Sequence, residues 1–78
     1  MIRKQLRLVI TFSTTTEAMA MEEMCKMKGL DGRLIPVPKT ITAGCGLAWS
    51  AKPESRDELI LHVTRALIQP EGLYECLV

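Results

Sequence analysis

Hydrophobic and polar residues alternate near the start of the chain, and the alternation predicts a β-strand over residues 5–12. One side of this strand is apolar at a period of two: Leu6, Leu8, Ile10 and Phe12. On the other side, Val9 is the only apolar residue. A period of two with one apolar side is typical of a strand that buries one face.

A run of hydroxyl residues, 13–16, follows this strand and precedes a helical pattern. Thr14 and Glu17 have the spacing of a capping box, in which the threonine side chain accepts from the first helical turn. The helix then extends to about Lys28, and Gly29 suits its C-terminal cap. At 100° per residue, four side chains share the face expected to meet the sheet: Ala18, Met21, Met24 and Cys25. Met19 and Met27 lie off that face and are candidate partner contacts.

The middle of the chain predicts two further strands. A turn at 30–32 leads into a strand over 33–37, whose prolines favour an edge position because proline cannot donate to a neighbouring strand. A third strand is expected over 46–51, with Leu47 and Trp49 on the face that we expect to be buried.

The last third of the chain predicts a second helix and a final strand. Ser55 and Glu58 have the spacing of a second capping box. The expected apolar stripe of this helix consists of Leu59, Ile60, Val63, Ala66 and Leu67. His62 falls opposite the stripe and is expected to be solvated. The sequence Pro70-Glu-Gly72 ends the helix, and residues 73–78 form the last strand.

The order β-α-β-β-α-β predicts a single α+β domain over residues 1–78. Its simplest arrangement is ferredoxin-like, a four-stranded antiparallel sheet with both helices on one face. The third strand then lies antiparallel beside the first. Its start therefore meets the end of the first strand, close to the first helix's N-terminus.

Composition and charge exclude several classes of partner. The net charge is +1 and no basic run occurs, so the electrostatic footprint of a nucleic-acid-binding protein is absent from the sequence. Single Phe, Tyr and Trp residues also disfavour a base-stacking surface. No apolar run approaches the roughly 20 residues that span a bilayer. Arg7 and Thr11 interrupt the apolar start, so we expect a cytoplasmic protein rather than a secreted one.

The chain has three cysteines: Cys25, Cys45 and Cys76. Their odd number, wide spacing and lack of a Cys-x-x-Cys pair favour reduced thiols over disulfides or a zinc site. We expect no metal and no cofactor. Cys25 and Cys76 fall in a helix face and a strand, where packing accounts for them.

Cys45 lies in a different setting, in the loop between the second and third predicted strands. Gly44 and Gly46 flank it, which lets another molecule approach the sulfur closely. Pro36 and Pro38 precede the loop and hold its entry extended. Lys39 follows them and is a candidate for steering anions to the loop, with a solvated lysine as the alternative. If the sheet forms as expected, the loop lies near Thr14, Thr15 and the positive end of the first helix, which lowers a thiol pKa. A small residue in a tight turn is the alternative interpretation of the same glycines.

The run Leu34-Ile-Pro-Val-Pro-Lys39, followed by Cys45-Gly-Leu-Ala48, resembles the selenium/sulfur (Se/S) carrier protein-like domain family. The resemblance covers about residues 8–78. Positions that match in order are Phe12, Ser13, Thr14, Thr15, Ala18, Glu22, Gly29, Pro36, Pro38, Lys39, Cys45, Gly46 and Leu47. Three positions depart from the family pattern. Ala43-Gly44 stands where hydroxyl residues are commoner, Trp49 replaces a smaller aliphatic residue, and Lys52 stands where an aspartate is usual.

The resemblance implies a carrier that holds sulfur or selenium on Cys45 as a persulfide or selenosulfide. Its partners would be a donor protein of the cysteine desulfurase type and an acceptor protein. Such a protein acts stoichiometrically rather than as a turnover enzyme. The alternative is a non-catalytic module that binds an anion or a partner chain in the same loop, with homodimerisation through the open sheet face.

Overall fold

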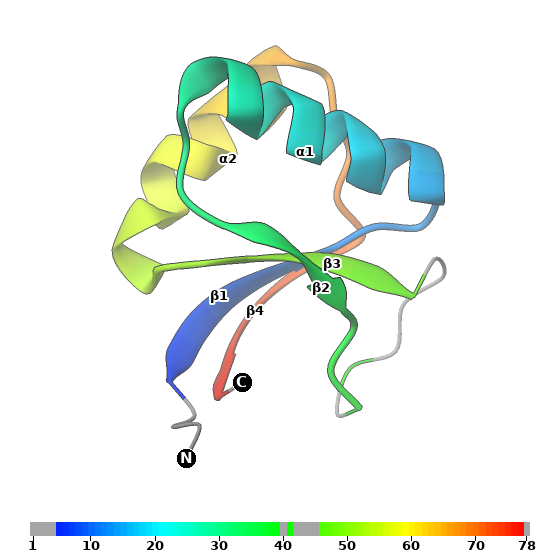
Figure 1. The fold of residues 1–78 in the computed structure, drawn as a ribbon, viewed down its shortest axis with the longest axis vertical. Coiled ribbons are helices and arrows are strands. Elements are labelled where there is room, and N and C mark those ends of the chain that lie inside the picture. Colours follow the sequence, from blue (N-terminus) through cyan, green and yellow to red (C-terminus); the bar gives the residue numbers. More distant parts are fainter. Residues whose placement is uncertain (1–4, 40, 42–45, 78) are drawn as a thin grey trace.

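The computed structural model describes residues 5–39, 41 and 46–77. Its elements, in chain order, are β1 (Leu6–Thr11), α1 (Thr15–Lys28), β2 (Arg33–Pro36), β3 (Leu47–Ala51), the short 3-10 helix η1 (Pro53–Ser55), α2 (Arg56–Arg65) and β4 (Gly72–Leu77). This order confirms the β-α-β-β-α-β prediction. Figure 1 shows both helices on one side of the sheet, which is the ferredoxin-like arrangement.

The described strands form one antiparallel sheet in the order β2-β3-β1-β4. β2 lies at an edge, as its prolines predict. The register places Thr11, at the end of β1, opposite Ala48 in β3 and opposite Gly72 in β4. The start of β3 therefore lies at the end of β1, which confirms the arrangement expected from the sequence.

The core lies between the sheet and the two helices. Its buried side chains are Leu8, Ile10, Phe12, Ala18, Met21, Cys25, Trp49, Ala51, Leu59, Val63 and Ile68. Leu34 and Leu47 are partly buried against this cluster. The larger pair of β3, Leu47 and Trp49, therefore faces the helices as predicted. The Trp49 indole N–H donates to the Asp31 carbonyl oxygen at 3.1 Å, so its one polar atom is satisfied inside the core.

The opposite face of the sheet also excludes water at its centre. Val9, Thr11, Ala48 and Ser50 are all buried, although the sequence predicts that only one side of β1 is buried. The Arg7 guanidinium donates to the Ser50 hydroxyl at 3.1 Å, and the aliphatic part of the Arg7 side chain lies on the same face of the sheet. Small side chains flanked by a long one account for the burial.

The two ends of α1 form as its sequence predicts. Thr14 has an extended backbone, and its hydroxyl accepts from the Glu17 N–H at 3.2 Å. Gly29 is in the left-handed conformation and its N–H donates to the Cys25 carbonyl oxygen. On the inner face, Ala18, Met21 and Cys25 are buried. Met19 and Met27 are exposed, as their positions off that face predict.

Two predictions for the second helix are wrong. Ser55 makes no capping hydrogen bond through its side chain, because Pro53 opens a 3-10 turn and Ser55 is already helical. The apolar stripe also does not continue to Leu67. The helix ends at Arg65, and Leu67 turns left-handed with φ 59°. This turn brings Ile68 to the core in place of Leu67, which is 85% exposed.

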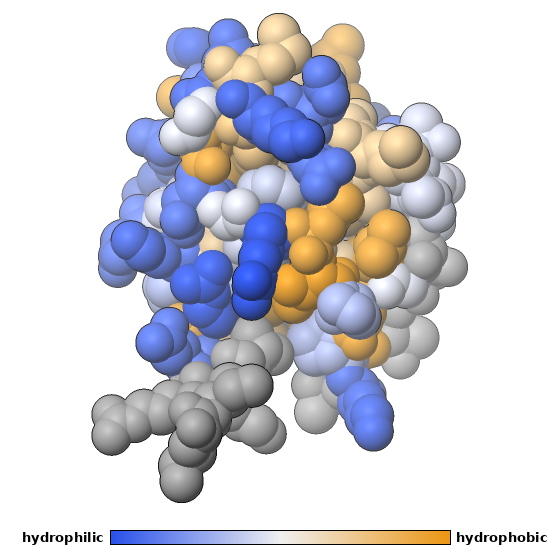
Figure 2. Space-filling model, viewed as in Figure 1, coloured by the Kyte–Doolittle hydropathy of each residue, from blue (hydrophilic) through white to orange (hydrophobic). Residues whose placement is uncertain are grey.

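On the face of the molecule that Figure 2 shows, hydrophobic surface is gathered over β2 and the adjoining part of β3. Leu34, Ile35 and Leu47 are half-buried there. Within the described part of the chain, neither helix is long and apolar enough to cross a membrane.

Candidate functional site

The candidate site is the loop between β2 and β3, which contains Cys45. Cys45 and Gly44 lie outside the described residues, so their predicted roles stay predictions. The base of the loop is described on both sides. The Val37 N–H donates to the Gly46 carbonyl oxygen at 3.0 Å, and this bond extends the pairing of β2 with β3 beyond Pro36 and Leu47.

A tight turn follows the Pro36-Val-Pro38 run. The Ile41 N–H donates to the Pro38 carbonyl oxygen at 2.9 Å, which is the hydrogen bond of a β-turn over residues 38–41. Pro36 and Lys39 are exposed, and Pro38 is half-buried. The prolines therefore bring the chain out of the edge strand and directly into a turn that carries an exposed cation.

Gly46 is in the left-handed region, with φ 75°. A Cβ atom placed on it would meet no other atom within 4 Å. The backbone conformation, rather than crowding, therefore requires glycine at this position.

The start of α1 lies at the same end of the sheet as Gly46. Continuing the register of Thr11 with Ala48 places Gly46 level with Ser13, just before the helix begins. The Thr14 hydroxyl accepts a hydrogen bond from the Glu17 N–H, and the Ala18 N–H donates to the Thr14 carbonyl oxygen.

Two backbone donors at this end of α1 have no partner in the part of the chain that the structure describes. Among the described residues, the N–H groups of Thr15 and Thr16 have no acceptor. They are the groups that stabilise an anion at a helix N-terminus. Thr14 therefore acts as the cap, and the role of Thr15 in binding an anion stays a prediction.

The other two cysteines lie in environments that disfavour a thiolate. Burial in the core raises the pKa of the Cys25 thiol from 9.0 to about 11. Burial also raises the pKa of Cys76 above its ordinary value. Cys76 pairs with Arg7 in β1, far along the strand from the Thr11 end where the loop begins. Both thiols therefore suit packing, as their positions in the sequence predict.

Two contacts between distant segments have no signal in the sequence. The Glu17 carboxylate accepts from the Gln69 N–H at 3.2 Å, which ties the first turn of α1 to the connection between α2 and β4. The Asp31 carboxylate accepts from the Lys52 N–H at 2.8 Å, while the Asp31 carbonyl receives the Trp49 indole. Two positions that depart from the family pattern, Trp49 and Lys52, thus both contact Asp31. Residue spacing cannot reveal such pairings, because each joins segments distant in the chain.

Comparison with known proteins gives one positive result. No curated protein matches the sequence, and no solved structure matches the fold. The sequence matches the family described as "Putative Se/S carrier protein-like" over residues 7–75, a span that includes nearly all of β1, both helices, the Cys45 loop and most of β4. The chain belongs to this Se/S carrier protein-like family.

Proposed function

We propose that this protein carries sulfur or selenium on Cys45 between a donor protein and an acceptor protein. The observation that supports the proposal most directly is the family match over residues 7–75. The burial of Cys25 and the raised pKa values of Cys25 and Cys76 add to it. They make Cys25 and Cys76 poorly suited to this chemistry.

In the loading step, the Cys45 thiolate attacks the outer sulfur of a persulfide on a cysteine desulfurase-type donor. A new sulfur–sulfur bond forms at Cys45 while the donor's sulfur–sulfur bond breaks, and the donor cysteine leaves as a thiolate. The outer sulfur moves without net oxidation or reduction. In delivery, an acceptor thiolate attacks the same outer sulfur and releases Cys45 as the thiolate. A selenium cargo would follow the same exchange.

The negative charge on the thiolate, and later on the outer sulfur, needs stabilisation. The open N–H groups of Thr15 and Thr16 and the positive end of α1 supply it in this proposal, with Lys39 as a further cation nearby in the chain. Glu17 opposes it, because its carboxylate lies in the first turn of the same helix. Glu17→Gln keeps an oxygen for the Gln69 N–H and removes the charge, so the Cys45 pKa should fall in that variant.

The test is intact-protein mass spectrometry after incubation with a cysteine desulfurase and cysteine. The expected result is a gain of one sulfur atom that maps to Cys45 and that a reducing agent removes. Cys45→Ser should abolish the gain. Cys25→Ala and Cys76→Ser, in which Cys45 is intact, should retain it and serve as matched controls.

Site-resolved alkylation at neutral pH provides an independent measurement. Cys45 should react fastest of the three thiols in the folded protein, since burial holds the other two in the protonated form. A sulfur gain that survives Cys45→Ser would overturn the proposal. So would an unmodified wild-type protein across several persulfide donors and selenium donors, and a non-catalytic binding role would then account better for the loop.

A further inference from the structure

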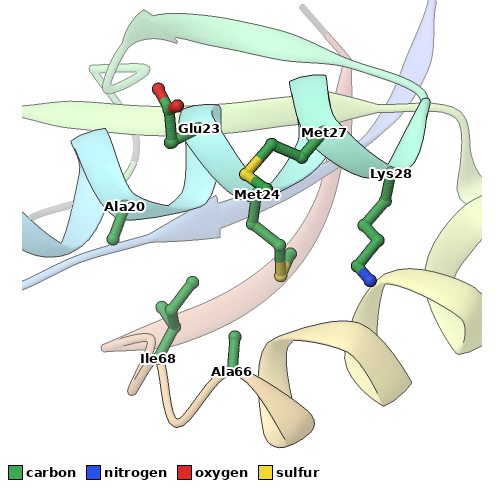
Figure 3. A pocket seen from close by; sticks show the side chains of 7 residues that line it. All are labelled: Ala20, Glu23, Met24, Met27, Lys28, Ala66 and Ile68. Carbon is green, nitrogen blue, oxygen red and sulfur yellow. The ribbon is translucent and has the colours of Figure 1, made fainter.

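An apolar groove runs between the second half of α1 and the connection that follows α2. It has a volume of about 290 Å³, and Ala20, Met24, Ala66 and Ile68 contribute to its lining. Figure 3 shows the Met24 side chain extending from α1 toward Ile68 and Ala66. An adjoining hollow of about 200 Å³ shares Met24 and Ala66 with it. The two helices thus leave a continuous hollow between them that their own side chains do not fill.

The rim of this hollow is mainly basic. Lys28 lines both parts, and Arg65 and His62 line the second. In Figure 3 the Lys28 side chain extends toward α2, whereas the Glu23 side chain points away from the hollow. Within the described residues, Lys28 and Arg65 have no carboxylate partner, so both cations are available to another molecule.

Leu67 adds a second, independent observation. It lies in the chain between two lining residues, Ala66 and Ile68, and it adopts φ 59°. A left-handed conformation is unfavourable for a bulky L-residue, and a helix of this kind usually ends in glycine. With 85% of its surface exposed, Leu67 gains little from burial to offset this strain. Met27, which lines the groove, is 76% exposed.

We propose that this groove binds an acidic amphipathic helix of a partner protein. The apolar floor accepts the helix's hydrophobic stripe, and methionines adapt to its shape. Carboxylates flanking that stripe pair with Lys28 and Arg65, whose unpaired charges select an acidic ligand over a basic one. Leu67 extends the apolar contact at one edge. The groove does not depend on the chemistry proposed for Cys45.

The test uses synthetic helical peptides of about 18 residues, a length at which helices are stable enough to compare. The first has a leucine stripe flanked by glutamates, the second has lysines in place of the glutamates, and the third is a scramble of the first. Each is titrated into the isotopically labelled protein and followed by backbone amide NMR. The acidic peptide should shift the amides of Ala20–Lys28 and 66–68, with a Kd about tenfold below that of the lysine peptide.

Variants separate the contributions of charge and shape. The double variant Lys28→Glu, Arg65→Glu should reverse the peptide preference. Leu67→Ala and Leu67→Gly should weaken binding of the acidic peptide equally, about fivefold, because both remove the exposed side chain. Only the glycine variant relieves the backbone strain, so equal weakening would show that the side chain, and not the strain, contributes to binding. Lys52→Glu, on an exposed residue outside the groove lining, is the matched charge control and should leave the preference unchanged.

Three outcomes would overturn the proposal. Equal affinities for the acidic and lysine peptides would show that the rim charges select nothing. Shifts confined to other surfaces would place the binding elsewhere. Groove amides that shift on raising the concentration of the protein alone, together with a dimer by light scattering, would identify a second copy of this chain as the occupant.

Discussion

The two α-helices end in the same backbone conformation with different residues. α1 ends at Gly29, with φ 66°, and α2 is followed by Leu67, with φ 59°. In both cases the next residue, Leu30 or Ile68, donates its N–H back to the helix, at 2.9 and 3.1 Å, and packs against the core. Packing of that apolar residue therefore fixes the left-handed turn. Only α1 has the residue that adopts the turn without strain.

The N-termini of the two helices differ in a related way. α1 is capped by Thr14, whose hydroxyl accepts a hydrogen bond from the N–H of Glu17, three residues later in the chain. The segment that opens α2 is held from a distance, since the Lys52 N–H donates to the Asp31 carboxylate and Ser55 caps nothing through its side chain. Local sequence thus determines both ends of α1, whereas a tertiary contact holds the segment before α2 and the packing of Ile68 in the core sets the end of α2.

The largest expected effect concerns the last turn of α1, where Cys25 is buried and its carbonyl accepts from Gly29 and Leu30. Its thiol has a pKa of about 11 in the fold, against 9.0 ordinarily. Between pH 9 and 11 the folded state therefore binds more protons than the unfolded state, and the free energy of unfolding falls as pH rises. The loss should be of the order of 2 kcal/mol.

Chemical denaturation between pH 9 and 11 measures this loss in the free energy of unfolding. Cys25→Ala is the control, because it removes this thiol and leaves every other ionisable side chain in place. The variant should be less stable than wild type at pH 7, since it leaves a cavity, and should lose less stability on going to pH 11. Parallel pH profiles for the two proteins would contradict the prediction.

Replacing the glycine at the end of α1 tests whether its conformation matters as argued. Gly29→Ala should lower the free energy of unfolding by between about 1 and 2 kcal/mol, because φ 66° is unfavourable for alanine. A Cβ there meets no atom within 4 Å, so a clash would not contribute. Thermal unfolding measures the change. Lys28→Ala, one residue earlier and inside the helix, is the matched control, and an equal loss there would refute the conformational explanation.

The hydrogen bond that holds the segment before α2 is expected to contribute slightly less. Asp31→Ala removes the acceptor of the Lys52 N–H and should cost about 1 kcal/mol. The Trp49 hydrogen bond should persist, because it uses the Asp31 backbone carbonyl. Asp31→Asn keeps a side-chain oxygen and should recover much of the loss. Tryptophan fluorescence that changes in the alanine variant would show that the core had moved and that loss of this hydrogen bond alone is not responsible.

The same division between local and distant determinants explains what the sequence could predict. The period of two in β1, the Thr14 cap and Gly29 are local signals, and the elements that they predict form as expected. The position of β2 at the sheet edge follows from its prolines. The Ser55 cap is wrong because Pro53 opens a 3-10 turn and Ser55 is already helical, and the stripe through Leu67 is wrong because Ile68 packs in the core in its place.

The candidate site also has features that the sequence could predict and contacts that it could not. The topology brings Gly46 level with the start of α1, as predicted, because strand order alone determines it. The contact between Glu17 and Gln69 has no counterpart in residue spacing. The roles of Gly44 and Cys45 stay predictions, since both lie outside the described residues.

The smallest expected effect has the opposite sign, and it concerns Leu67. Leu67→Gly should raise the free energy of unfolding by about 0.5 kcal/mol, because relief of the left-handed strain slightly exceeds the entropy that glycine gains in the unfolded chain. Leu67→Ala keeps the strain and should be no more stable than wild type. The hydrogen bonds of Leu67 and Ile68 to Thr64 and Val63 use backbone atoms and persist in both variants. Paired denaturation curves measure the difference, and a glycine variant no more stable than the alanine variant would mean that Leu67 is not strained.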